Sequence, residues 1–200
     1  GSLEAARPVC EQLFDPNDPD KLTMLGTTYG QHGNYAEALK PLRRAAELSP
    51  NSPQAQYNLA LDCFQLQRYA EAREALATVV KRWPDLSPLG TLYGAVLFKL
   101  DEKAPAYEAL QHAHELNPQD PDAAKMLYET GLGLAQEKLA SKEYPASVRY
   151  LNEAARLFPQ QPEPHRLLAK AYKASGRQSE AAEEQRQFEI LIVEADAKPN

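Results

Sequence analysis

The 34 residues from Pro19 to Ser52 read PDKLTMLGTTYGQHGNYAEALKPLRRAAELSPNS. This stretch decides the fold, because its arrangement of large, small and polar residues returns in the next two blocks of the chain. A proline stands near the end of each block, at Pro50, Pro84 and Pro118, so the interval between these prolines is 34 residues. A fixed period of this length is typical of helical repeat arrays.

Each block has two amphipathic halves separated by a short polar break. Within each half, apolar or small residues recur at spacings of three and four, which predicts one helix per half. In the first block these residues are Leu22, Leu25, Gly26, Tyr29, Ala38, Leu42 and Ala45. The polar breaks are Gly33-Asn34-Tyr35, Gln67-Arg68-Tyr69 and Asp101-Glu102-Lys103. The pattern therefore predicts a repeated helix–turn–helix unit.

The order of residue types within a block is also distinctive. The first block carries, in order, Leu25-Gly26, Tyr29, Ala38, Leu42 and Pro50. This order resembles the signature of the tetratricopeptide repeat. The resemblance implies an all-α fold, a right-handed α-solenoid superhelix of stacked antiparallel helix pairs. We expect small residues where the two helices of a repeat approach closely, at Gly26, Ala60 and Gly94 on the first helices and Ala38, Ala72 and Ala106 on the second.

The expected domain organisation is one solenoid over residues 3–200. Residues 4–9 (EAARPV) mirror residues 37–42 (EALKPL), so the chain is expected to start in a truncated repeat, as a fragment of a longer tetratricopeptide-repeat protein. Gly1-Ser2 is interpreted as a cloning scar. The predicted units are 3–18 (an orphan second helix), 19–52, 53–86, 87–120, 121–161 (lengthened by seven residues), 162–195 (the terminal repeat) and 196–200 (a tail).

The fourth repeat departs from the period, because Pro118 and Pro159 are 41 residues apart. Seven residues advance a helix by about 700°, close to two full turns, so the buried face is kept. Two alternatives are open: a long first helix from about 122 to 140, or a longer loop that Gly131 and Gly133 favour. A long helix either projects as a ledge that touches a partner or packs against the adjoining repeat. The ledge residues are Met126, Leu127 and Tyr128.

Composition argues against two classes of partner. The formal net charge is −6 and the isoelectric point is about 5.3, whereas nucleic acids and anionic membrane surfaces attract basic proteins. The longest apolar cluster, Ile190 to Val193, is much shorter than the ~18 residues of a spanning helix. We therefore expect neither nucleic acid nor membrane as a partner of this fragment. No signal peptide is present, and the compartment stays undecided because the chain is expected to begin within an array.

No motif for catalysis, cofactor binding or metal binding is found. The histidines lack the i, i+4 spacing of helical metal sites, at His32, His112, His114 and His165. Cys10 and Cys63 lie in separate repeats and predict no disulfide framework, and Cys63 takes a core position. Phosphate loops, dinucleotide fingerprints and nucleophile elbows are likewise missing. The sequence thus predicts no catalytic, cofactor or metal residues, and no enzyme.

The resemblance implies that the first helix of each repeat lines a concave groove. Of the positions on this side, the first repeat contributes Thr23, Thr27 and Gln31. The predicted peptide-binding residues are Tyr57, Leu61, Phe64, Thr91, Phe98, Arg166, Lys170 and Lys173. They make the middle of the groove apolar and aromatic and its far end basic. Such a groove suits a peptide or helix with apolar anchors and an acidic flank.

Each part of this groove has a structural alternative. The apolar residues either bind a ligand or pack against other helices. The basic residues either bind an acidic flank or form a solvated face balanced by acids on the next helix. Those acids are Glu180, Glu183 and Glu184.

These patterns predict a protein–protein interaction scaffold that binds a peptide or partner helix in the groove. The alternative is a structural or assembly module that self-associates through its terminal helices or through a projecting long helix. An apolar stripe on the last helix supports this alternative, unless the stripe packs inward on Leu168 and Tyr172. The stripe consists of Phe188, Leu191, Ile192 and Ala195.

Overall fold

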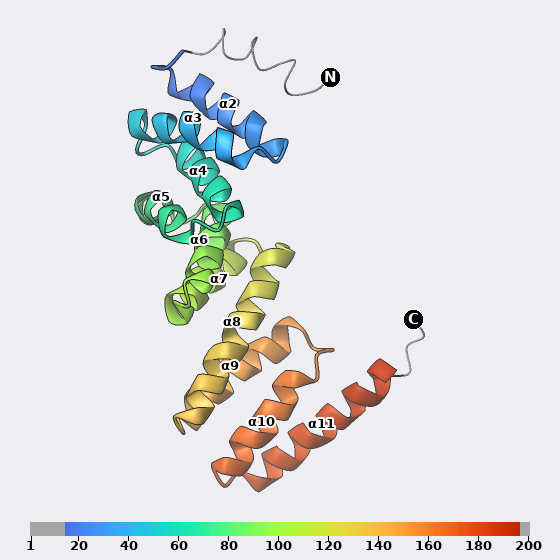
Figure 1. Cartoon of the computed structure of the whole chain (residues 1–200). Helices are drawn as coiled ribbons and strands as arrows, with labels where there is room; N and C mark the ends of the chain where they lie inside the picture. Colours follow the sequence, from blue (N-terminus) through green and yellow to red (C-terminus); the bar gives the residue numbers. More distant parts are fainter. Residues whose placement is uncertain (1–14, 197–200) are drawn as a thin grey trace. The chain divides into compact units, whose positions relative to one another are not determined.

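The computed structural model describes residues 15–196, which form helices and turns and contain no strand (Figure 1). The predicted orphan helix over 3–14, with Cys10, and the tail from residue 197 lie outside the described residues. The chain divides into two compact units, Gly1–Asn117 and Pro118–Asn200. The continuity of one solenoid over residues 3–200 and its repeat boundaries therefore stay predictions, and each unit is described by itself.

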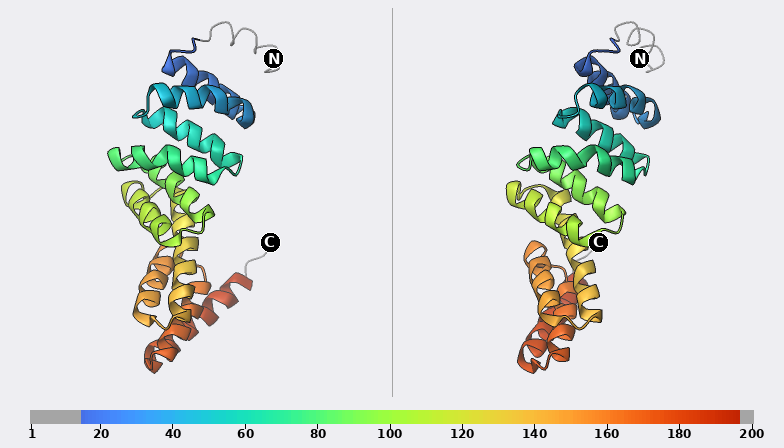
Figure 2. Two further views of the ribbon diagram at one scale, coloured as in Figure 1. Left: turned by 60° about the vertical axis from the view of Figure 1, so that its left-hand side comes forward. Right: turned by 90° about the vertical axis from the view of Figure 1, so that its left-hand side faces the viewer.

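The first unit contains three helix pairs that alternate helices of 13 and 14 residues. The two helices of a pair lie side by side and antiparallel (Figures 1 and 2). Each second helix also packs on the first helix of the next pair. The helices are α2 (Pro19–Gln31), α3 (Tyr35–Leu48), α4 (Pro53–Gln65), α5 (Tyr69–Arg82), α6 (Ser87–Lys99) and α7 (Lys103–Leu116).

The second unit contains two helix pairs with the same connectivity. Its helices are α8 (Pro121–Ala140), α9 (Tyr144–Leu157), α10 (Glu163–Ala174) and α11 (Gln178–Asp196). α8 packs on α9, α9 on α10 and α10 on α11. Both units are thus built from stacked antiparallel helix pairs, which confirms the all-α solenoid class. Among the described residues, no helix is long and apolar enough to cross a membrane.

The turn inside each helix pair has one recurring backbone geometry. One residue per turn has positive φ: Gly33, Gln67, Asp101, Lys142 and Gly176. In the first turn, the N–H groups of Gly33 and Asn34 donate to the carbonyls of Gly30 and Tyr29, which is the Schellman arrangement that ends a helix. The other four turns repeat both bonds. The intervals between these residues are 34, 34, 41 and 34, so the backbone follows the sequence period and its single stretch.

Small residues hold the two helices of a pair close together. A Cβ added to Gly94 would lie 2.5 Å from Leu110 Cγ, and one added to Gly26 would clash equally with Leu42. The small residues predicted on the second helices, Ala38, Ala72 and Ala106, are fully buried. The predicted close approach within each repeat of the first unit is confirmed where glycine is present.

The seven extra residues of the fourth repeat lengthen its first helix. α8 is continuous over 20 residues, compared with 13 in α2, α4 and α6. Leu127 is buried, and the Tyr128 ring packs edge-on against Phe158 with centroids 5.1 Å apart. The long-helix alternative is therefore confirmed, and its ledge residues pack within the protein. This packing removes the projecting helix as a surface for self-association.

Candidate functional site

The first unit brings five of the predicted binding residues onto two neighbouring helices. Tyr57, Leu61 and Phe64 lie on α4, and Thr91 and Phe98 lie on α6. α4 contacts both α2 and α6, so the first helices of the three pairs are neighbours, as the groove hypothesis requires. All five residues are half-buried.

Half-burial shows that part of each apolar side chain serves the fold. Tyr57, Leu61 and Phe64 pack against the core of the first unit, and the Phe64 ring lies edge-on to Tyr69 with centroids 5.4 Å apart. The packing alternative therefore accounts for the inner part of these side chains. The outer part of each remains accessible to a ligand, so the two alternatives are compatible.

A polar seam joins α2 to α4 at the start of this face. Gln54 Nε2 donates to Asn58 Oδ1 over 3.0 Å, and Asn58 Nδ2 donates to Thr27 Oγ1 over 2.7 Å. The hydroxyls of Thr27 and Thr23 donate in turn to carbonyl oxygens one turn earlier on α2, each over 2.7 Å. We call Thr23, Thr27, Gln54 and Asn58 the polar seam. It borders a hollow of about 400 Å³ lined by Asp20, Thr23, Met24, Thr27, Thr28, Gln31, Ser52, Gln54 and Asn58.

Asp62 lies one turn beyond Asn58 on α4 and is only 4% exposed. Its Oδ2 atom is buried without a hydrogen-bond partner. Burial alone raises the pKa of this carboxyl from 3.8 to about 6. Asp62 was not among the predicted residues, although the 34-residue register contained a signal, because the equivalent positions hold Thr28 and Val96.

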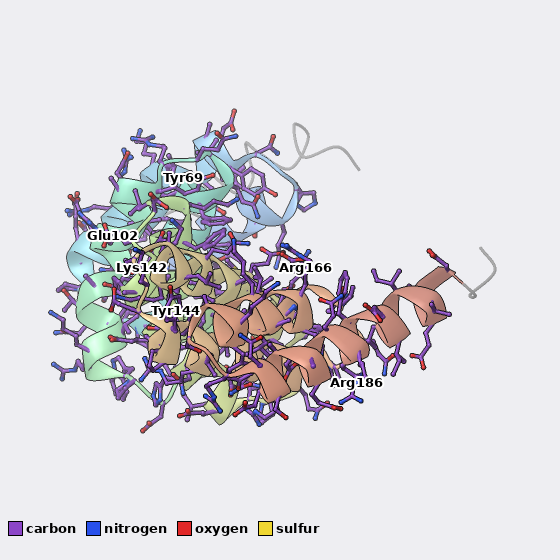
Figure 3. All side chains as sticks on the ribbon, turned by 90° about the horizontal axis from the view of Figure 1, so that it is seen from below. Tyr69, Glu102, Lys142, Tyr144, Arg166 and Arg186 are labelled. Atoms are coloured by element: carbon purple, nitrogen blue, oxygen red, sulfur yellow. The ribbon has the colours of Figure 1, made fainter. Side chains whose placement is uncertain are left out.

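The second unit places the three basic residues of the predicted site together on α10. Arg166, Lys170 and Lys173 border a hollow of about 520 Å³ between α10 and α11, and Figure 3 labels Arg166. We call this cavity the basic hollow. Its remaining lining residues are uncharged, at Ala169, Gln178, Ala181, Ala182 and Gln185.

The acids on α11 neutralise other groups than these lysines. Glu180 pairs with Arg177 at 2.8 Å and Glu184 with His165 at 2.7 Å. Glu183 pairs with Arg186, which Figure 3 labels on α11. On α10 itself, Arg166 donates two hydrogen bonds to Glu163, of 2.6 and 2.8 Å. Within the described part of the chain, Lys170 and Lys173 therefore face the basic hollow without an acidic partner.

The titratable groups give little support to catalysis. Burial raises the pKa of the Cys63 thiol to about 11, whereas a nucleophilic cysteine requires a lowered pKa. The described residues contain no group of histidines, cysteines and carboxylates that would hold a metal ion. Cys63 is free and buried, as expected for a core residue. The surfaces available for function are thus the face of α2, α4 and α6 in one unit and the basic hollow in the other.

Comparisons with known proteins agree with this architecture. A family profile described as "Tetratricopeptide repeat" matches residues 132–191, and one described as "Anaphase-promoting complex, cyclosome, subunit 3" matches residues 1–79. The fold defines an α-solenoid of helix–turn–helix repeats. The chain is a tetratricopeptide-repeat protein.

Among solved structures, the fold is similar to that of YrrB, with a TM-score of 0.67, 19% identity and coverage of 98% of this chain and 100% of the other. YrrB is described as a TPR protein with an unusual peptide-binding site. A MamA structure has a TM-score of 0.65 at 18% identity, covering 90% of this chain and 98% of that chain. These likenesses show the fold.

Two curated relatives match part of the chain. Intraflagellar transport protein 70A2 of Mus musculus is 33% identical over 91 residues, which cover 41% of this chain and 14% of the relative. The BBSome complex member BBS4 homolog of Drosophila melanogaster is 28% identical over 102 residues, 51% of this chain and 21% of the relative. The chain thus spans a small part of the length of the relatives it matches.

Proposed function

We propose that this protein is a non-enzymatic interaction scaffold that binds a peptide or partner helix on the first helices of its repeats. In the first unit the ligand lies over α4 and α6, where Tyr57, Leu61, Phe64, Thr91 and Phe98 supply apolar anchor positions. In the second unit the basic hollow, with Arg166, Lys170 and Lys173, takes an acidic segment. The two surfaces are proposed separately.

One observation carries this proposal: Lys170 and Lys173 face the basic hollow while every acid considered as their neutraliser on α11 pairs with another base. Like charges without counter-charges repel each other, so an acidic ligand gains electrostatic energy there. The likeness to YrrB, described as having a peptide-binding site, supports a peptide as the ligand. The names of the curated relatives place those proteins in transport and BBSome assemblies, which supports a role in a protein complex.

The experiment is capture of the full chain on an array of 12-residue peptides that vary in acidity and aromatic content. Wild-type protein is expected to favour acidic peptides, and Lys170→Glu/Lys173→Glu is expected to lose this preference by ~10-fold or more. The matched control is Lys125→Glu/Arg149→Glu, which changes the charge equally at exposed positions on α8 and α9. An unchanged preference in the hollow variant, or an equal loss in the control, contradicts the basic site.

The apolar surface needs its own variant. Phe64→Ser/Phe98→Ser removes two half-buried rings, and peptide affinity is expected to fall by ~10-fold or more, because aromatic anchors dominate interface energetics. Helicity is checked by circular dichroism, since both side chains also contribute to the fold. Leu116→Ser on α7 is the control, because this leucine is exposed on a second helix. Retained affinity in a folded double variant excludes the aromatic face as the site.

A second candidate function is self-association through the last helix. α11 has 19 residues and extends beyond its 12-residue partner α10 (Figure 1). Leu191 is buried and Phe188 half-buried, so part of the apolar stripe packs inward. The exposed side chains Ile190 and Val193, at 51% and 67%, form the remaining apolar surface.

Sedimentation equilibrium distinguishes the two functions. Self-association through α11 predicts a mass that rises with concentration and returns to that of a monomer in Ile190→Lys/Val193→Lys. A monomer at all concentrations removes the assembly function for this chain. Neither result depends on the peptide experiments.

A further inference from the structure

The first repeat differs from the next two at one position of the proposed binding face. Gly30 of α2 occupies the place that Phe64 and Phe98 hold at intervals of 34 residues. The helix that follows carries Asp62, where the equivalent positions hold Thr28 and Val96. Two substitutions therefore coincide: an aromatic ring is missing from α2, and a carboxylate is present on α4.

These two substitutions meet in space. A Cβ added to Gly30 would lie 2.8 Å from Asp62 Oδ1 and 3.0 Å from Oδ2, so the carboxylate fills the space beside the glycine. A phenylalanine at position 30 and this rotamer of Asp62 exclude each other. Glycine is thus the residue that gives the carboxylate its place between α2 and α4.

The protein supplies no counter-charge to this carboxylate. Asp62 is 4% exposed, and its Oδ2 accepts no hydrogen bond. Burial is the cause of its raised pKa, and no cationic side chain offsets it. Buried carboxylates are ordinarily paired or hydrogen-bonded, so the missing partner is a requirement that a ligand can meet.

The adjoining hollow selects for a ligand rich in donors. No lysine, arginine or histidine lines it, and Asp20 adds a second carboxylate. In the polar seam, the amides of Gln54 and Asn58 and the hydroxyl of Thr27 each already donate a hydrogen bond. The carboxylate of Asp62, one turn beyond Asn58, is the acceptor left without a donor.

We propose that Asp62, in the space left by Gly30, binds the side chain of a lysine or arginine from a peptide that lies along α2 and α4. The inference rests on the proposed function, because it names one residue of the peptide that the first unit binds. An ammonium or guanidinium group supplies both the positive charge and the N–H donors that the carboxylate lacks. The first unit then selects a basic residue, whereas the basic hollow of the second unit selects acidic ones.

The test uses the full chain and the array of 12-residue peptides described above. The tightest peptide for the wild type is resynthesised with each lysine or arginine replaced in turn by glutamine, and affinities are measured by fluorescence anisotropy. One such replacement is expected to weaken binding to the wild type by ~10-fold or more, as for a charge-assisted hydrogen bond. For Asp62→Asn the same replacement is expected to change the affinity by less than about twofold.

Asp20→Asn is the matched control, since Asp20 is an exposed aspartate that lines the same hollow. It is expected to keep the ~10-fold discrimination. A second variant, Asp62→Thr, copies Thr28 of the preceding repeat and covers the case in which the asparagine variant misfolds. Circular dichroism verifies the fold of all three variants.

The outcomes separate the inference from the proposed function. If the wild type captures no peptide of any composition, the proposed function fails and the inference fails with it. If peptides bind without dependence on any basic residue, the inference alone is wrong. It is also overturned if the discrimination survives in Asp62→Asn and Asp62→Thr, or if Asp20→Asn abolishes it equally.

Discussion

At the residue scale, Asp62 lowers the stability of the fold whenever its carboxyl is charged. Its pKa rises from 3.8 in the unfolded chain to about 6 in the folded protein, so the folded state binds the proton more tightly. The contribution of this residue to stability is therefore most favourable below pH 4 and declines as the pH rises through 6. A shift of this size corresponds to about 2–3 kcal/mol at pH 7.

Asp62→Asn tests this sign. The variant is expected to be more stable than the wild type at pH 7 by about 2 kcal/mol, because it removes a buried charge. The advantage is expected to vanish near pH 4, where the carboxyl is protonated in both states. Urea denaturation at several pH values measures the difference, and a variant that is less stable at pH 7 contradicts the account.

Two glycines test the packing within repeats at the same scale. Gly26→Ala and Gly94→Ala each place a methyl group against a leucine of the paired helix. Each is expected to destabilise the fold by about 1–2 kcal/mol, after the ~1 kcal/mol that alanine gains over glycine in a helix. The reverse change Ala60→Gly, at the equivalent position of the second repeat, is the control and is expected to cost only about 1 kcal/mol. Thermal or urea unfolding checks all three, and a stabilised Gly26→Ala would show that the two helices are farther apart.

At the element scale, the recurring turn is the most regular feature of the chain. Gln67, Asp101 and Lys142 adopt a left-handed conformation with φ between 59° and 62°, which costs non-glycine residues energy. Gly33 and Gly176 occupy the same position in the first and last turns without this cost.

Lys142→Gly is therefore expected to stabilise the protein by about 1 kcal/mol. Ser141→Gly is the matched control, because Ser141 has φ of −79° and glycine there only adds entropy to the unfolded chain. The two variants are expected to change the melting temperature in opposite directions. Equal effects would contradict the assigned turn geometry.

The sequence predicted these elements well because their causes are local. The spacing of apolar residues, the polar breaks at Gly33 and Asp101 and the seven-residue stretch all act within one helix or one turn. The same reasoning left the packing of Tyr128 open, because contact with Phe158 depends on where the following helix ends. Periodicity determines which face of a helix is buried, and the identity of the neighbour depends on the tertiary structure.

At the scale of the whole molecule, the chain forms two compact units that meet at Asn117 and Pro118. In repeat proteins each repeat is stabilised by its neighbours, so a cut between units is tolerated better than a cut within a helix pair. Residues 1–117 and 118–200 are each expected to fold with cooperative unfolding. A cut after Asp101 separates α6 from α7, and its fragments are expected to lose much of their helicity. Circular dichroism of the four fragments checks this, and equal behaviour of both cuts would contradict the division.

The candidate site was predictable only in part. The sequence identified the basic residues of α10 because they follow one helix face, and it identified the aromatic residues of α4 and α6 from the register. It did not show that Glu180, Glu183 and Glu184 pair with other bases, since those contacts depend on side-chain geometry. Asp62 was missed because its burial arises from Gly30, a residue 32 positions earlier on another helix.

The central claim is that the first helices carry the ligand, and photo-crosslinking tests it most directly. The tightest array peptide is synthesised with a photoreactive phenylalanine analogue at each position in turn, and mass spectrometry locates the crosslinked residues on the full chain. The account predicts crosslinks on α2, α4 and α6 in the first unit, near Leu61 and Phe98, and beside the basic hollow in the second. Crosslinks confined to the second helices α3, α5, α7 and α9 would contradict it.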